Sequence, residues 1–119
     1  MDIKLFDSEL NVMKLLWQEG ELTAKELAER LSREIGWNKN TTYTVIKKCV
    51  DKQAVQRIDP GFICRPLISR EKVQRQETDE LINKMFGGSS ELFFSSFLKE
   101  KGVDAKEAQR LLEFIKNTK

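Results

Sequence analysis

Apolar residues recur at helical spacing along the first third of the chain. A first helix is predicted from Asp7, a suitable N-cap, to Gly20, a residue that commonly ends helices. Thr23 and Glu26 then form a T-x-x-E capping box, in which each side chain satisfies a free backbone amide at a helix start. The box predicts a second helix, which Gly36 ends.

A third helix is predicted from Asn38 to about Gln53. Its apolar side follows the i, i+3, i+4, i+7 pattern of Thr42, Val45, Ile46 and Cys49. For an isolated helix, the polar side would most simply be an ordinary solvated face. Its place as the last of three short helices favours a function in binding. The outer face carries hydrogen-bonding groups, one aromatic ring and two cations: Asn40, Tyr43, Thr44, Lys47, Lys48 and Asp51.

A short β-hairpin is predicted after these helices. Val55–Ile58 and Phe62–Arg65 are rich in strand-forming residues, and Asp59-Pro60-Gly61 between them is built from strong turn formers. Three helices followed by a hairpin is the order of a winged helix. Arg57 and Arg65 would lie where a wing approaches a phosphate backbone, although each could equally be a surface charge that aids solubility.

The last part of the chain predicts three more helices. Ser69 can cap a helix that is polar from Gln74 to Glu80 and ends at Gly87-Gly88, which is typical of a bridge between two packed units. The two short helices that follow carry four phenylalanines, more apolar surface than they can bury alone, so we expect them to pack against a second copy of the chain. Folding back onto the first unit is the alternative. The candidate dimerisation residues are Leu92, Phe93, Phe94, Phe97, Leu98, Leu111, Leu112 and Ile115.

The predicted fold class is therefore mostly α with a small β-hairpin. We expect a winged helix-turn-helix domain over residues 1–70 and a helical dimerisation domain over residues 71–119.

Charge is distributed unevenly along the 119 residues. The formal net charge is +2, but residues 39–75 hold nine basic and three acidic side chains, a local excess of 9 − 3 = +6. A local basic excess is typical of a nucleic-acid-binding region. The flanking segments are net acidic.

Several classes of function are disfavoured by what the sequence contains. It has no histidine, no glycine-rich phosphate loop and no metal-ligand spacing, so we expect neither an enzyme nor a bound cofactor or metal. Cys49 and Cys64 are most simply buried, reduced thiols. Nothing resembles a transmembrane run or a cleavable leader, which predicts a cytoplasmic protein.

Five blocks along the chain resemble the penicillinase repressor (BlaI/MecI-type) family of winged-helix transcriptional regulators. They occur in the family's order and spacing, and they cover nearly the whole chain: Asp7-Ser8-Glu9-Leu10-Asn11-Val12-Met13-Lys14-Leu15-Leu16-Trp17, Leu22-Thr23-Ala24-Lys25-Glu26-Leu27, Gly36-Trp37, Pro66-Leu67-Ile68-Ser69-Arg70-Glu71 and Phe86-Gly87-Gly88-Ser89.

The resemblance implies a homodimer that represses transcription from a palindromic DNA operator, with control of antibiotic-resistance (β-lactamase-type) genes as one possible role. It implies that the third helix enters the major groove. The family's contacts at the start and outer face of that helix map onto Lys39, Asn40, Thr41, Tyr43, Thr44 and Lys48. With Lys47 and the two hairpin arginines, the candidate DNA-binding set is Lys39, Asn40, Thr41, Tyr43, Thr44, Lys47, Lys48, Arg57 and Arg65.

The chain departs from the family pattern at several positions. Asn38-Lys39-Asn40-Thr41 stands where the family usually has Ser-Pro-Lys-Thr, and Tyr43 and Thr44 also differ, so the operator sequence is expected to differ. The turn of the hairpin is short. Better-known members are inactivated by proteolysis at an Asn–Phe bond, and the resemblance offers a membrane sensor metallopeptidase as a partner. The matching bond is Ser96-Phe97, where serine for asparagine puts that cleavage in doubt. The copper-responsive relatives' C-terminal cysteines are missing.

The leading hypothesis is thus a dimeric DNA-binding repressor. About four phosphate contacts per protomer would give a dimer a logarithmic salt slope of roughly −7. The alternative is a winged-helix module that docks a partner protein without sequence-specific DNA binding. Reversing the charges of Lys47 and Lys48 distinguishes the two, because it should abolish a DNA complex and leave an apolar protein interface nearly intact.

Overall fold

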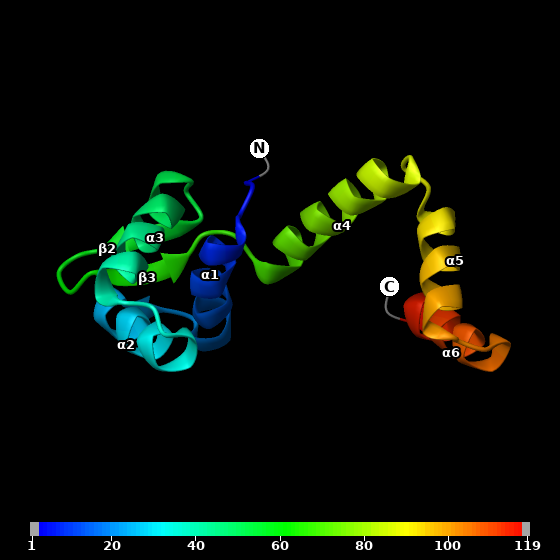
Figure 1. Cartoon of the computed structure of the whole chain (residues 1–119), viewed down its shortest axis with the longest axis horizontal. Helices are drawn as coiled ribbons and strands as arrows, with labels where there is room; N and C mark the ends of the chain where they lie inside the picture. Colours follow the sequence, from blue (N-terminus) through cyan, green and yellow to red (C-terminus); the bar gives the residue numbers. More distant parts are fainter. Residues whose placement is uncertain (1–2, 118–119) are drawn as a thin grey trace. The chain divides into compact units, whose positions relative to one another are not determined.

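A computed structural model describes the backbone of residues 3–117 and the side chains of residues 3–114. The chain divides into two compact units, Met1–Gln76 and Glu77–Lys119, and each is described by itself. The first unit holds three helices and three short strands, drawn from blue to green in Figure 1. In chain order these are α1 (Asp7–Glu19), β1 (Leu22–Thr23), α2 (Ala24–Ile35), α3 (Lys39–Asp51), β2 (Val55–Ile58) and β3 (Ile63–Pro66).

The helix starts follow the capping chemistry of the sequence, with one exception. The Thr23–Glu26 capping box forms as predicted: Glu26 N–H donates to the threonine hydroxyl, and its carboxylate accepts from Thr23 N–H. Prediction of Asp7 as the N-cap of α1 was wrong, because Phe6 occupies that position. There the carboxylate of Glu9 accepts the Phe6 N–H at 2.7 Å, so an acid inside the helix satisfies a free amide at its start.

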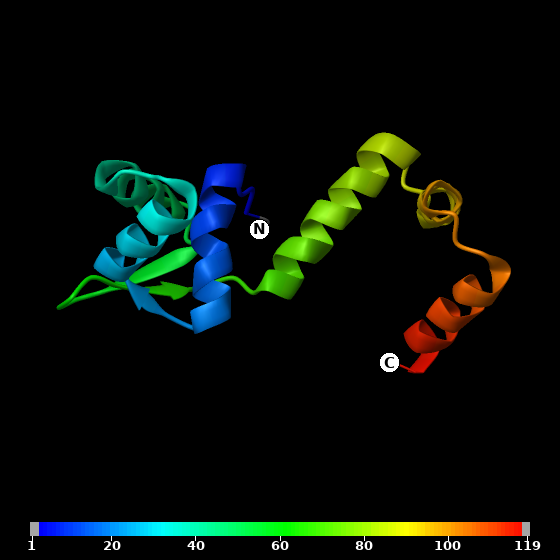
Figure 2. The ribbon, with the colours of Figure 1, turned by 60° about the horizontal axis from the view of Figure 1, so that its bottom comes forward.

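The hairpin forms where it was predicted, and a third strand that was not predicted joins it. β2 and β3 pair antiparallel, with Val55 opposite Pro66. β1 adds to the other edge of β3, where Leu22 lies opposite Cys64, so the strand order is β1-β3-β2. A strand of two residues carries no alternation that a sequence pattern could reveal. The turn of the hairpin projects away from the helices in Figures 1 and 2; we call β2, β3 and this turn the wing.

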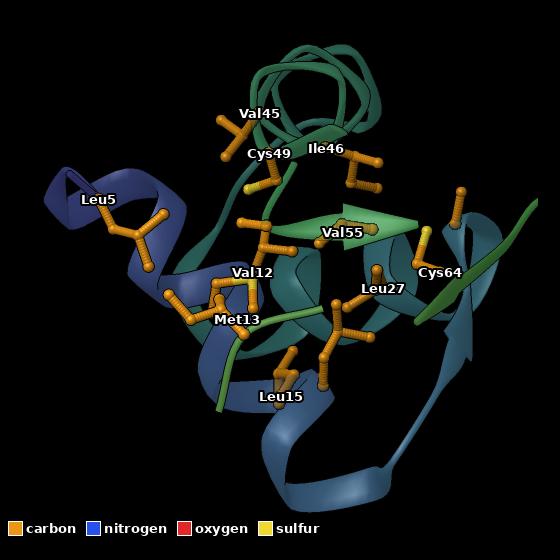
Figure 3. Packing of buried hydrophobic residues seen from close by; sticks show 14 of the residues in the cluster. Leu5, Val12, Met13, Leu15, Leu27, Val45, Ile46, Cys49, Val55 and Cys64 are labelled. Atoms are coloured by element: carbon orange, nitrogen blue, oxygen red, sulfur yellow. The ribbon is translucent and has the colours of Figure 1, made fainter. Parts of the chain in front are cut away.

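One hydrophobic core holds the first unit together. Figure 3 shows Val12 and Met13 from α1, Ile46 from α3 and Val55 from β2 converging on it, and each of these four side chains is at most 1% exposed. All four residues of the predicted apolar side of α3 are buried. The first residues of α4 also join this unit, because Val73 belongs to the core. Burying one face of α3 leaves its opposite face to solvent.

The remaining elements are α4 (Arg70–Phe86), α5 (Ser90–Lys101) and α6 (Ala105–Asn117). Ser69, Ser89 and Asp104 each accept a hydrogen bond from a backbone amide three residues further on, at the start of one of these helices. No side chain of α5 is buried. Within residues 3–117, no helix is long and apolar enough to cross a membrane.

Candidate nucleic-acid interface

The outer face of α3 presents a stripe of polar side chains. Asn40, Thr44, Lys47 and Asp51 follow an i, i+4, i+7, i+11 spacing that places them along one side of the helix, opposite the buried positions. All four are exposed. Lys39 and Lys48, also exposed, lie to either side. The first three residues of the stripe offer amide, hydroxyl and ammonium groups, which suit hydrogen bonding to base edges and phosphates, and Asp51 places a carboxylate at the C-terminal end of the stripe.

Two predicted contact residues of α3 are less accessible. Thr41 and Tyr43 are half-buried, and the Tyr43 ring packs against the core of the first unit. The backbone N–H of Thr41 donates to the side chain of Asn38 at 2.8 Å, which makes Asn38 the N-cap of the helix. Asparagine is among the residues best suited to this capping position.

The basic residues of the central stretch differ in availability. Among the described residues, Lys39, Lys47 and Lys48 have no ion-pair partner. The Lys39 ammonium lies 5.7 Å from the centre of the Tyr43 ring. Lys52 lies elsewhere: its ammonium is 2.7 Å from the buried carboxylate of Glu9 and also donates to the carbonyl of Lys4. Lys52 therefore stabilises the fold, and its charge does not belong to the interface.

Both wing arginines are held by carboxylates of the same chain. The Nε of Arg57 lies 3.1 Å from Asp59, and the Nε of Arg65 lies 3.0 Å from Glu21. All four side chains are about half exposed, so these pairs are in contact with water and each is worth little to stability. They do reduce the positive charge that the wing presents. Among the described residues, Lys39, Lys47 and Lys48 of α3 remain as interface cations without an ion-pair partner.

The second unit carries a different candidate surface, which is apolar. Phe94, Phe97 and Leu98 of α5 and Ala108, Leu111 and Leu112 of α6 line a groove of about 520 Å³. Other large apolar side chains of the same two helices are strongly exposed, Leu92 of α5 by 60% and Phe114 of α6 by 70%. Phe93 is different, because its ring packs within the chain against Phe86, Phe94 and Phe97. Of the predicted dimerisation residues, the side chain of Ile115 lies outside the described part.

The predicted cleavage bond joins Ser96 and Phe97 in the middle of α5. Both residues are exposed, Phe97 by 46%. The bond nevertheless lies in continuous helix, which must open locally before a protease can bind it in extended form. Phe97 also lines the apolar groove, so cutting here would divide one of its two walls.

The two thiols are remote from this chemistry. Cys49 and Cys64 are free and buried. Burial raises the pKa of Cys49 to about 12 and that of Cys64 to about 11, so both are protonated and poorly nucleophilic near neutral pH. Among the described residues, no group of three or more acids and cysteines is placed to hold a metal ion.

Comparison with known proteins identifies the family. The family model described as penicillinase repressor matches residues 5–117. The chain belongs to the penicillinase repressor family. A penicillinase repressor of Bacillus licheniformis is 25% identical over 121 residues, which cover 98% of this chain and 94% of that protein. One of Staphylococcus aureus is 18% identical over 115 residues, covering 95% and 91%.

Solved structures of the family resemble this chain over part of its length. The solution structure of the DNA-binding domain of the repressor BlaI is 27% identical, with a TM-score of 0.54, and the match covers 58% of this chain and 87% of that one. The monomeric form of Bacillus licheniformis BlaI in complex with the blaP half-operator gives a TM-score of 0.52 at the same identity and coverage. The winged-helix fold is thereby confirmed.

Proposed function

We propose that this member of the penicillinase repressor family acts as a homodimer on a palindromic operator, with one α3 in the major groove of each half-site. Family membership over residues 5–117 makes the protein a DNA-binding transcriptional repressor. The similar BlaI structure with a bound half-operator supports a role for the same fold in this chain. The observation that carries the proposal here is the exposed polar stripe on α3.

The exposed side chains of α3 contribute differently to sequence recognition and to affinity. Asn40 can pair bidentately with adenine, and the hydroxyls of Thr41 and Thr44 can bond either a donor or an acceptor on a base edge. Lys39, Lys47 and Lys48 would bind phosphates, which fixes register and affinity without specifying sequence. Arg57 and Arg65 complete the proposed set, although each already pairs with a carboxylate of this chain. Tyr43, also predicted to contact DNA, has its ring against Phe62.

Dimerisation is supported by the apolar groove between α5 and α6. One protomer contacts too few base pairs to select a single site in a genome, since a mismatch costs only about 1–3 kcal/mol. Two protomers double the number of contacts and require two half-sites at a fixed spacing. A second copy seated on Phe94, Phe97, Leu111 and Leu112 would remove their exposed surface from water.

Release of the operator is proposed to follow loss of the dimer. Cleavage of the Ser96-Phe97 bond, by a protease such as a membrane sensor metallopeptidase, would divide α5 and disrupt the groove. The dimer population then falls, and the operator is freed by mass action. By this proposal the protein works in the cytoplasm, is no enzyme itself, and controls genes of the β-lactamase type.

Selection from genomic DNA tests the proposal. Full-length protein is incubated with sheared genomic fragments of its source, and retained fragments are sequenced beside those retained by a Lys47→Glu/Lys48→Glu variant. The proposal predicts enrichment of promoter fragments that contain an inverted repeat, and loss of that enrichment in the variant. Equal profiles for the two proteins, or no enrichment, would favour a winged helix that docks a partner protein.

A further inference from the structure

An aromatic contact joins the wing to the recognition helix. The rings of Tyr43 on α3 and Phe62 at the end of the wing turn meet edge to face, with 5.8 Å between centroids and 73° between planes. This is a favoured geometry for an aromatic pair. Both residues are half-buried and pack against the core of the first unit. We call Tyr43 and Phe62 the wing contact.

Cations extend this contact at both ends. The Arg57 guanidinium stacks on the Phe62 ring at 3.7 Å, while its Nε binds Asp59. At the other end, the Lys39 ammonium lies 5.7 Å from the Tyr43 ring centre. These contacts make a continuous row from the first turn of α3 to the wing, in the order Lys39, Tyr43, Phe62 and Arg57. Cation–π and ring–ring attraction stabilise the row.

The backbone of Phe62 also helps to fix the position of the wing turn. Phe62 has a φ of +50°, a conformation that non-glycine residues seldom adopt. Its carbonyl oxygen accepts the N–H of Ala24 at 2.9 Å, which ties the end of the turn to the start of α2. Movement of the wing relative to α3 would have to break the ring contact, and movement relative to α2 would have to break this hydrogen bond.

These observations bear on the role of Tyr43. Its position on α3 is at the flank of the polar stripe, beside Lys39 and away from the middle positions Asn40 and Thr44. One edge or face of its ring is already engaged with Phe62 and the core. A ring that packs against the wing is poorly placed to contact a base edge as well.

We propose that Tyr43 is a positioning residue that acts through Phe62, setting the distance and angle between the wing and the recognition helix, and that it does not itself contact a base. The inference rests on the proposed DNA-binding function and goes beyond it. The operator's sequence would be selected by Asn40, Thr41 and Thr44, while the wing contact sets which flanking phosphates the wing meets.

The test compares four variants of the full chain. Tyr43→Leu and Phe62→Leu remove one ring each, and the double variant shows whether the two act together. Tyr43→Phe removes only the hydroxyl and is the matched control. Operator affinity, discrimination against single-base changes, and ethylation interference at phosphates are measured for each, after circular dichroism has confirmed its helix content.

We expect each leucine variant to weaken operator binding by about 2- to 12-fold per protomer, the range of one aromatic pair. The double variant should bind the operator about as tightly as the single leucine variant with the lower affinity, because all three variants lose the same ring contact. Interference should disappear only at the phosphates flanking each half-site, with base discrimination unchanged. Tyr43→Phe should behave as the unmodified protein. Amide hydrogen exchange across residues 55–66, measured without DNA, should accelerate in the leucine variants alone.

Specific outcomes overturn the inference. Loss of discrimination at one base position in Tyr43→Phe would show that the hydroxyl contacts that base. Additive losses in the double variant would show that the two rings act independently. Unchanged binding in all variants would refute the positioning role while leaving the proposed function intact. Failure of the unmodified protein to bind any selected DNA would instead refute the proposed function, and the positioning role with it.

Discussion

Arg65 donates from its Nε to a carboxylate oxygen of Glu21 at 3.0 Å, across 44 positions of the sequence. The pair links β3 to the residue that precedes β1, at the edge of the sheet where the wing begins. A negative charge at this place opposes the approach of DNA and occupies the arginine that would bind a phosphate. The wing of this protein is therefore less positive than its arginine content alone indicates.

Glu21→Gln should consequently strengthen DNA binding. Once freed, Arg65 can bind a phosphate, which would make the logarithmic salt slope steeper by up to about 0.9 per protomer. The increase should be equal for operator and random DNA, because phosphates carry no sequence information. Fluorescence anisotropy at several salt concentrations measures it. Glu91→Gln, which removes the same charge from an exposed position of α5, is the control. Weaker binding by Glu21→Gln would show that the ion pair holds the wing in place.

Asn40 and Lys47 should separate specificity from affinity. Asn40→Ala is expected to reduce discrimination between operator and random DNA by about 1–3 kcal/mol, since one bidentate base contact is lost. Lys47→Gln should weaken binding to both DNAs equally and make the salt slope of the dimer shallower by about 1.8, from two lost phosphate contacts. Competition binding with both DNAs measures each effect. A uniform loss in Asn40→Ala would place that side chain on a phosphate.

Leu111 should be essential for self-association. Its side chain is 49% exposed beside the apolar groove, so Leu111→Glu would place an unpaired carboxylate in the proposed dimer interface. Burying that charge is expected to weaken the dimer by about 100-fold or more. Sedimentation equilibrium measures the change. Gln109→Glu adds the same charge at another exposed position of α6 and should leave the dimer intact. Equal dimerisation by both variants would place the interface elsewhere.

The buried thiols should be unreactive in the folded protein. With the pKa of Cys49 at about 12 and that of Cys64 at about 11, neither forms a thiolate at pH 8, and neither is accessible. Because these folded pKa values are raised, their contribution to stability is complete below the ordinary thiol pKa of about 8.5 and is lost as pH rises through the folded values. Labelling by a thiol reagent should therefore require unfolding. Rapid labelling of native protein at pH 8 would contradict this.

Local patterns predicted the six helices, the hairpin and the buried face of α3, because helical periodicity, capping and turn signals involve residues near in sequence. The structure adds what depends on distant residues. Glu9 looks like an ordinary first-turn acid, yet it is 1% exposed and paired with Lys52. The pairing of Arg65 with Glu21 likewise depends on how the sheet assembles. No local pattern encodes such contacts, so the sequence overestimated the free positive charge of the wing and of the central stretch.

The salt dependence expected for DNA binding is therefore weaker than the one predicted from the sequence. Four phosphate contacts per protomer would give a slope of roughly −7. With both wing arginines paired within the chain, Lys39, Lys47 and Lys48 are the cations of the interface that lack an ion-pair partner among the described residues. A phosphate that meets a wing arginine still paired with a carboxylate is not neutralised by it, so such contacts add little to the slope. Three lysine contacts per protomer, or six per dimer, give a slope of about −5.

The most direct test is a titration of the full-length protein against the inverted repeat recovered from genomic selection, compared with the same DNA in which one or both half-sites are scrambled. The account predicts two protomers per intact site, a slope of about −5, and an affinity at least about 10³-fold above that for the fully scrambled DNA. Equal affinity for the intact and the fully scrambled DNA, under conditions where sedimentation shows a dimer, would contradict it.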